Sequence, residues 1–216
     1  MPMSTPRAAQ RPRGVPFEVT DCNGFAMPTA ASAVLSWRRR PGSACASPLT
    51  VPHTVVRKFA IILCTDFVNS TKQAAAAGDT AWRETMEGHD RLTRDLVGRH
   101  GGLVVGSTGD GLLATFDVPS QAVPCGVEML KALADIGVTI RAGVHAGEIG
   151  IVEGDITGIA VNLATRVSQK AADGEFWVSS TVRDRMLGGR TAFADRGQHA
   201  LKGFDEPWRL YRVGRS

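Results

Sequence analysis

The chain has 216 residues, of which 43% are hydrophobic and 21% are charged, and its formal net charge is +4. This content suffices for one ordinary domain with a real core, and it excludes fibrous and wholly disordered proteins. Residues 1–58 contain eight Lys or Arg and two acidic residues, so they carry +6 and the remainder carries −2. Because the basic charge belongs to the first part of the chain, we expect no nucleic-acid binding by the folded part.

Residues 1–55 are rich in Pro, Arg, Ala and Ser and show no sustained hydrophobic periodicity. We interpret them as a largely disordered basic tail, in which the run 38-RRR-40 is a solvated stretch of charge, or as an over-long predicted start. We assign residues 56–216 to the folded domain. No apolar stretch approaches the roughly 18–20 residues of a membrane helix. The segment 25-FAMPTAASAVLSW-37 is a poor signal peptide, because its arginines follow it.

The cysteines show no paired spacing along the chain. They are Cys22, Cys45, Cys64 and Cys125. Cys64 lies inside an apolar run, where a small hydrophobic residue is the ordinary interpretation. We therefore expect reduced thiols and a cytoplasmic location.

The folded part is expected to begin near Phe59. The stretch 59-FAIILCTDF-67 is almost continuously apolar, which indicates a strand buried on both faces, and 69-NST-71 can cap a following helix. Apolar residues then recur at spacings of three and four, which predicts an amphipathic helix that ends at 101-GG-102. Its apolar face carries Trp82, Met86, His89, Leu92 and Leu96. We interpret His89 as a core or dimer-interface residue.

A hairpin is predicted next, from 103-LVV-105 and 112-LLATF-116 around the turn Gly109-Asp110-Gly111. Ser120 is expected to cap another helix, with Pro124 tolerated in the first turn. The buried side of that helix carries Ala122, Gly126, Met129, Leu130 and Leu133.

The last third begins with 138-VTIRAGVHAGEIGIV-152, which alternates as a strand, a glycine-containing bend and a second strand. A helix over about 158–170 follows, then short strands and one more helix up to about 213. This order predicts an α+β fold with a ferredoxin-like βαββαβ core and extra C-terminal strands and helix. Its antiparallel sheet is expected to be covered by helices on one face.

Two carboxylates fall where such a sheet presents side chains. Asp66 ends the first strand and Asp110 lies at the hairpin tip, and in this strand order the two can reach one point in space. Two such residues before a helix N-terminus suit two Mg²⁺ ions that carry a polyphosphate. An ordinary turn residue and a helix-capping residue would give the same pattern.

Five further polar residues stand out, although each has an ordinary interpretation by itself. Asn162 and Arg166 are four apart on the predicted helix and share one face, as a solvated pair also would. Arg141 interrupts an apolar strand and requires an anionic partner or an exposed position. Lys202 stands among turn residues. His145 in 143-GVHAG-147 is interpreted as structural rather than as a ligand.

Together these residues form blocks that resemble the catalytic domain of the class III nucleotide cyclases over roughly residues 59–213. The blocks are 64-CTDFVNST-71, 107-STGDGLLATF-116, 141-RAGVHAGE-148, 161-VNLATR-166 and 200-ALKG-203. One TD or GDG motif would be weak, but five blocks in order are highly specific. The resemblance implies a phosphorus–oxygen lyase of intracellular signalling, which converts ATP to 3′,5′-cyclic AMP and pyrophosphate.

The same resemblance implies a head-to-tail homodimer with two sites, each built from both chains. Asp66 and Asp110 of one chain would bind two ions, Mg²⁺ or Mn²⁺. Asn162 of the other chain would orient the ribose, and its Arg166 would stabilise the transition state. Further substrate contacts are implied for Asp155, which would accept a hydrogen bond from the adenine amino group, for Arg141 and Lys202 at the triphosphate, and for Phe67.

One position departs from the family pattern. Active adenylate-type members carry a Lys four residues before the Asp of the GDG turn, where it helps to recognise the purine, and this chain has Gly106 there. A lost hydrogen bond to the base costs roughly 1–3 kcal/mol, which is about tenfold to a hundredfold in specificity constant. We therefore expect a weak adenylate cyclase or one of relaxed purine specificity.

Two other functions remain open. A catalytically silent cyclase-like module that binds a nucleotide or regulates a partner would also explain Gly106. A guanylate cyclase or an enzyme of mixed purine use would have to accept GTP although Asp155 faces the O6 acceptor of guanine.

Overall fold

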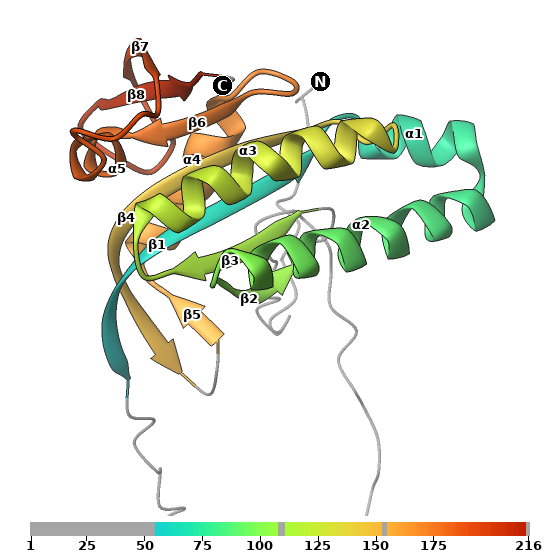
Figure 1. Ribbon diagram of the computed structural model, residues 1–216, viewed down its shortest axis with the longest axis horizontal. Helices are drawn as coiled ribbons and strands as arrows, with labels where there is room; N and C mark the ends of the chain where they lie inside the picture. Colours follow the sequence, from blue (N-terminus) through green and yellow to red (C-terminus); the bar gives the residue numbers. More distant parts are fainter. Residues whose placement is uncertain (1–54, 108–110, 153–154, 215–216) are drawn as a thin grey trace, which may run out of the picture. The chain divides into compact units, whose positions relative to one another are not determined.

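The computed structural model describes residues 55–107, 111–152 and 155–214 (Figure 1). The prediction of a disordered tail therefore concerns, except for Val55, residues outside those described. Asp110 also lies outside them.

An eight-stranded sheet forms the centre of the domain, in the order β2-β3-β1-β4-β6-β8-β7, with β5 paired to β4 alone. The strands are β1 (Val56–Phe67), β2 (Leu103–Ser107), β3 (Leu112–Phe116), β4 (Ile140–Val152), β5 (Asp155–Thr157), β6 (Phe176–Ser179), β7 (Phe193–His199) and β8 (Trp208–Val213). All neighbours are antiparallel except β4 and β6. The predicted α+β class is confirmed.

Strand β4 corrects one prediction, because it is a single strand and not two strands around a bend. It pairs with the whole length of β1, from Val56 opposite Ile151 to Phe67 opposite Ile140. This continuous ladder of hydrogen bonds holds the glycines of β4 in extended backbone.

Five helices accompany the sheet in the described part of the chain: α1 (Ser70–Ala77), α2 (Asp79–Arg99), α3 (Pro119–Asp135), α4 (Ile159–Lys170) and α5 (Ser180–Arg185). Helix α1 begins after Asn69 as expected, but Asn69 has a left-handed φ of 56° and forms no capping side-chain bond. Helix α2 has the predicted apolar face, and Gly101 follows its end with φ 72°. His89 is buried there against Phe67, so it is a core residue of the single chain.

The start of α3 differs from the prediction. Val118 is the N-cap, Pro119 is the first helical residue and Ser120 lies inside the helix without a capping role. Pro119 fits the first position because it has no N–H that needs a partner. Pro124 therefore stands beyond the first turn, where it removes one backbone hydrogen bond of α3.

The helices cover both faces of the sheet, so the prediction of one covered face is wrong. Helices α2 and α3 pack with Ile61 and Leu63 of β1 (Figure 1). Helix α4 packs with Ala60, Ile62 and Cys64, the alternate residues of the same strand, and so lies on the opposite face. A strand with apolar residues on both faces needs a cover on both.

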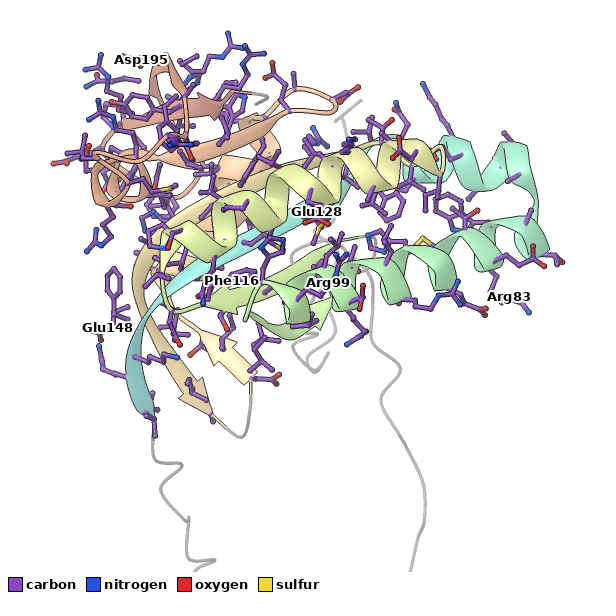
Figure 2. The ribbon with its side chains drawn as sticks, in the orientation of Figure 1. Arg83, Arg99, Phe116, Glu128, Glu148 and Asp195 are labelled. Atoms are coloured by element: carbon purple, nitrogen blue, oxygen red, sulfur yellow. The ribbon has the colours of Figure 1, made fainter. Side chains whose placement is uncertain are left out.

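Helices α2 and α3 are also joined to each other at their surface. Arg99 at the end of α2 lies 3.3 Å from Glu128 of α3, and His100 lies 2.8 Å from the same carboxyl group (Figure 2). Beneath them, Phe116 of β3 is 2% exposed in the core.

Candidate active site

The carboxylate of Asp66 lies at the C-terminal end of β1. By the alternation of the strand, it is on the face that α4 covers. Arg141 of β4 is its direct cross-strand partner, and Arg141 Nη2 donates a hydrogen bond of 2.7 Å to Asp66 Oδ2. The side chains are 31% and 30% exposed, respectively, so solvent reaches both. The anionic partner that Arg141 required is therefore Asp66.

The base of the hairpin that carries Asp110 is tied to the end of β1. The backbone N–H of Leu112 donates a 3.0 Å hydrogen bond to the Thr65 hydroxyl, and both residues are buried. Thr65 precedes Asp66, and Leu112 is two residues after Asp110. This bond thus fixes the first residue of β3 beside the strand end that bears Asp66.

Gly106 leaves open space on the edge strand β2. It pairs with Leu113 of β3, which pairs in turn with Cys64, so position 106 belongs to the face that α4 covers. A Cβ placed on Gly106 would meet no atom within 4 Å. Strand β5, which carries the exposed Asp155, contacts β2, so positions 106 and 155 lie on neighbouring segments.

Helix α4 turns Asn162 outward, since its buried residues are Ala160, Leu163, Ala164, Val167 and Ser168. Arg166 is partly exposed and donates a 2.7 Å hydrogen bond to Gln169. The helix lies directly on β4, where a Cβ on Gly143 would be 2.2 Å from the Ser168 nitrogen. This close approach requires glycine and keeps the outward face of α4 in place.

The two remaining predicted residues lie in different settings. Lys202 is exposed in the turn after Leu201, and Leu201 is buried in the cluster around Trp177. Phe67 is 3% exposed and packs its ring against Trp82 and His89. A nucleotide contact by Phe67 would therefore have to use its main chain.

Within one chain the structure brings only part of the predicted site together. Asp66 and Arg141 touch, and Thr65 ties them to the hairpin. Among the described residues, no hydrogen bond or ion pair joins Asp66 to Asn162, Arg166 or Lys202. The same residues contain no group of three His, Cys, Asp or Glu that could hold a metal ion.

Thr65 is the site residue that sequence reasoning missed. A Thr in an apolar strand is common, and nothing along the chain shows that its hydroxyl bonds a backbone 47 residues away. Only the register of β1 against β3 reveals the contact.

His145 is structural, as expected from the sequence. It is 5% exposed, its Nδ1 lies 2.9 Å from the Ser179 hydroxyl, and its ring meets Trp208 edge-on at 5.4 Å. Burial, and then the positive charge of Arg185, lower the pKa of His145 to about 4 from its usual 6.5. The ring is therefore neutral in the folded chain at pH 7.

We expect this buried imidazole to make the fold less stable in mild acid. Between the pKa of His145 in the unfolded chain and its lower pKa in the folded chain, the unfolded state binds more protons. The free energy of unfolding therefore decreases as the pH is lowered through that window, and it levels off at lower pH. The loss from about pH 7 to about pH 5 amounts to about 2 kcal/mol. Urea unfolding of wild type and His145→Gln at both pH values measures it, and His199→Gln serves as the control. Parallel losses in wild type and His145→Gln would contradict the assignment.

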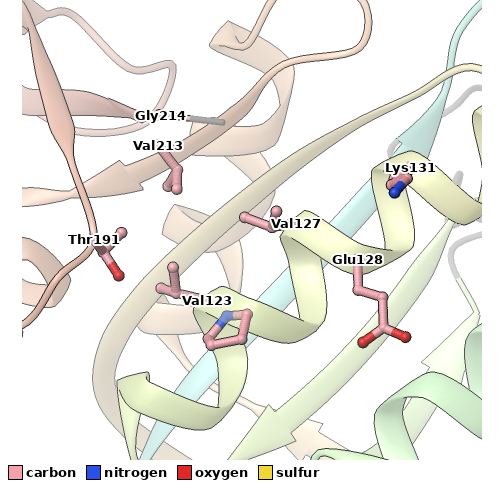
Figure 3. A pocket seen from close by; sticks show the side chains of 8 residues that line it. Val123, Val127, Glu128, Lys131, Thr191, Val213 and Gly214 are labelled. Atoms are coloured by element: carbon pink, nitrogen blue, oxygen red, sulfur yellow. The ribbon is translucent and has the colours of Figure 1, made fainter. Parts of the chain in front are cut away.

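Two hollows lie between α3 and the C-terminal strands, and neither is lined by a predicted site residue. The one in Figure 3 has a volume of about 220 Å³ and lies between Val123 and Val127 of α3 and Thr191 and Val213. The other, of about 770 Å³, extends along α3 to Phe176.

Known proteins are similar to this chain in both sequence and fold. No family model matches the chain. The Rhizobium meliloti protein named "Putative adenylate cyclase 3" is 29% identical over 169 residues, which cover 74% of this chain and 29% of that protein. The adenylyl cyclase CyaB of P. aeruginosa superposes with a TM-score of 0.70 at 21% identity, over 76% of this chain and 97% of that structure. An adenylate/guanylate cyclase/hydrolase of Silicibacter pomeroyi superposes with a TM-score of 0.63 at 25% identity, over 74% of this chain and 98% of that structure.

The chain spans less than a third of the length of the Rhizobium relative. No helix among the described residues is long and apolar enough to cross a membrane. The cyclase motifs, the α+β sheet and these similarities lead to one conclusion: the chain belongs to the class III adenylyl/guanylyl cyclase catalytic domain family.

Proposed function

We propose that the chain converts ATP to 3′,5′-cyclic AMP and pyrophosphate, at two sites shared between the chains of a head-to-tail homodimer. The observation that carries the proposal is the strand end itself, where Asp66 contacts Arg141 and Thr65 holds the base of the Asp110 hairpin. Free thiols at Cys64 and Cys125 are consistent with a cytoplasmic location.

The side chains at this strand end fit a divalent metal. The Asp66 carboxylate is a hard oxygen ligand that solvent reaches, and the neighbouring Thr65 binds Leu112, which is two residues after Asp110 in the sequence. In our proposal Asp66 and Asp110 hold two Mg²⁺ or Mn²⁺ ions. When bound, such ions acidify the ribose 3′-hydroxyl and neutralise the polyphosphate.

The other residues position the substrate. The 3′-hydroxyl gives its proton to solvent, and its oxygen attacks the α-phosphorus in line, while the bond from the α-phosphorus to the bridging oxygen of the leaving pyrophosphate breaks. Arg141 and Lys202 bind the triphosphate. Asn162 orients the ribose, and Arg166 stabilises the charge that develops on the transferred group.

The orientation of α4 supports a contribution from a second chain. Asn162 faces outward, and Arg166 is bonded to Gln169 of its own helix and not to the strand end. Ile159, the first residue of α4, is 70% exposed, as an apolar residue at an interface between chains would be in the isolated chain. We therefore assign Asn162 and Arg166 to the Asp66 site of the partner.

Purine choice depends on Gly106 and Asp155. Asp155 on β5 would accept a hydrogen bond from the adenine amino group and would repel the O6 acceptor of guanine. Gly106 supplies no second contact, and the loss costs roughly 1–3 kcal/mol. We infer a weak preference for ATP over GTP, with turnover below that of a complete site.

A silent nucleotide-binding module is the second candidate, and Gly106 is the observation that favours it. Such a protein would bind ATP with metal and form no product.

The first experiment is a product assay on purified dimer with Mn²⁺ or Mg²⁺, with ATP and GTP side by side. We expect cyclic AMP to form from ATP, and cyclic GMP to form more slowly from GTP. Asp110→Ala should reduce the product by about a thousandfold, because the metal site is lost. Cyclic AMP from Asp110→Ala at the wild-type rate would rule out the assigned metal site, and ATP binding without product would favour the silent module.

A further inference from the structure

We propose that Arg141 occupies Asp66 in the nucleotide-free chain and thereby keeps divalent metal ions off this carboxylate until a nucleoside triphosphate arrives. The incoming triphosphate then takes the guanidinium from Asp66, so that metal and nucleotide bind together. This inference rests on the proposed function in one respect, namely that Asp66 binds metal.

The contact between the two side chains is strong and direct. Cross-strand partners on one face have Cβ atoms about 4.5–5.5 Å apart, so the pair needs no backbone adjustment to meet. The Nη2–Oδ2 distance is 2.7 Å, as in a charge-assisted hydrogen bond. A metal ion at Asp66 would have to displace this bond and would then stand beside a positive charge. Both effects weaken the binding of a metal by itself.

The Arg141 guanidinium has bonding capacity left for a phosphate. Within the described residues its ion pair is with Asp66 alone, and its buried Nε has no partner there. A guanidinium has five N–H donors and binds phosphate oxygens in pairs. Transfer from one carboxylate oxygen to a polyphosphate therefore increases the number of bonds that Arg141 makes.

The backbone on both sides of the pair is held, so the exchange involves side chains only. Thr65 is bonded to Leu112, and Phe67 is fixed in the core. On β4, the N–H of Ala142 bonds the Glu175 carbonyl, and the N–H of Gly174 bonds the Ile140 carbonyl. Rotation of the Arg141 side chain can open Asp66 without moving either strand.

The test measures Mn²⁺ binding to nucleotide-free protein, by the electron paramagnetic resonance signal of free Mn²⁺. Arg141→Gln is expected to bind Mn²⁺ about tenfold more tightly than wild type, because the competing cation is gone. The same variant should bind 3′-deoxy-ATP, which cannot cyclise, about tenfold more weakly in the presence of Ca²⁺.

The control is Arg57→Gln. Arg57 joins Glu148 across the same two strands at the same 2.7 Å, but at the far end of β1 (Figure 2). The Arg57→Gln substitution should leave Mn²⁺ binding unchanged. Adding Asp66→Asn to Arg141→Gln should remove the gained affinity, which ties the gain to this carboxylate.

Unchanged or weaker Mn²⁺ binding in folded Arg141→Gln would overturn the proposal. If that variant does not fold, Arg141→Met provides the same comparison. Wild type gives an independent measure, since 3′-deoxy-ATP should raise the Mn²⁺ affinity of the protein beyond what the nucleotide binds in solution, and absence of that coupling would also overturn the proposal. A chain that forms no cyclic nucleotide would still show these effects, so failure of the proposed function is distinguishable.

Discussion

Mixing a chain that carries Asp66→Asn with a chain that carries Arg166→Ala is expected to restore cyclic AMP formation that neither variant shows alone. The activity of each variant by itself should be lower than wild type by about a thousandfold or more. Asp66→Asn lacks a metal carboxylate, and Arg166→Ala lacks the cation proposed to act at the transition state. In a mixed head-to-tail dimer both substitutions fall in one site, and the other site is intact. Mixed dimers purified away from both parent dimers keep one intact site of two, so they should return about half of wild-type activity.

The measurement is a product assay on two differently tagged chains, refolded together and purified through both tags. Asp66→Asn mixed with Asp110→Ala is the matched control, and it should stay inactive because each of the two sites then lacks a carboxylate. Inactive mixed dimers of Asp66→Asn with Arg166→Ala would show that the site is not shared as proposed.

Gly106→Lys is expected to raise the specificity constant for ATP by about tenfold to a hundredfold. Position 106 is in an edge strand, next to the segment that carries Asp155, and a Cβ there meets no atom within 4 Å. The backbone at position 106 requires no glycine, because Gly106 does not have a positive φ angle. A lysine side chain can therefore be placed at position 106 without a cost in packing, and in the proposed site its ammonium group would face the purine.

Gly106→Met separates the charge from the bulk, since Met has a similar length and cannot donate a hydrogen bond. It should raise turnover little or not at all. An equal gain from both variants would mean that filling the space matters and that purine recognition does not. No gain from Gly106→Lys in an intact dimer would favour the silent module.

Several features of the site were predictable because their chemistry is local. A nearly continuous apolar run that ends in Asp66 indicates a buried strand with a polar end, and a spacing of four puts Asn162 and Arg166 on one helix face. Helix α2 was predictable for the same reason, because its apolar residues recur at spacings of three and four within one segment of the sequence. Helix starts were less predictable, because Asn69 and Ser120 have the right side chains but form no cap.

The sequence by itself determined most of the strand and helix order and the candidate carboxylates, since both follow from residue types and short spacings. The expectation of a missing purine contact at Gly106 came from the resemblance to the cyclase family. Only the tertiary structure decided that α4 covers the second face of the sheet, that Thr65 holds Leu112, and that Arg141 is bonded to Asp66. These contacts join residues between 47 and 101 positions apart. They depend on strand register and on the choice of face, and both are settled by packing of the whole domain rather than by any local pattern.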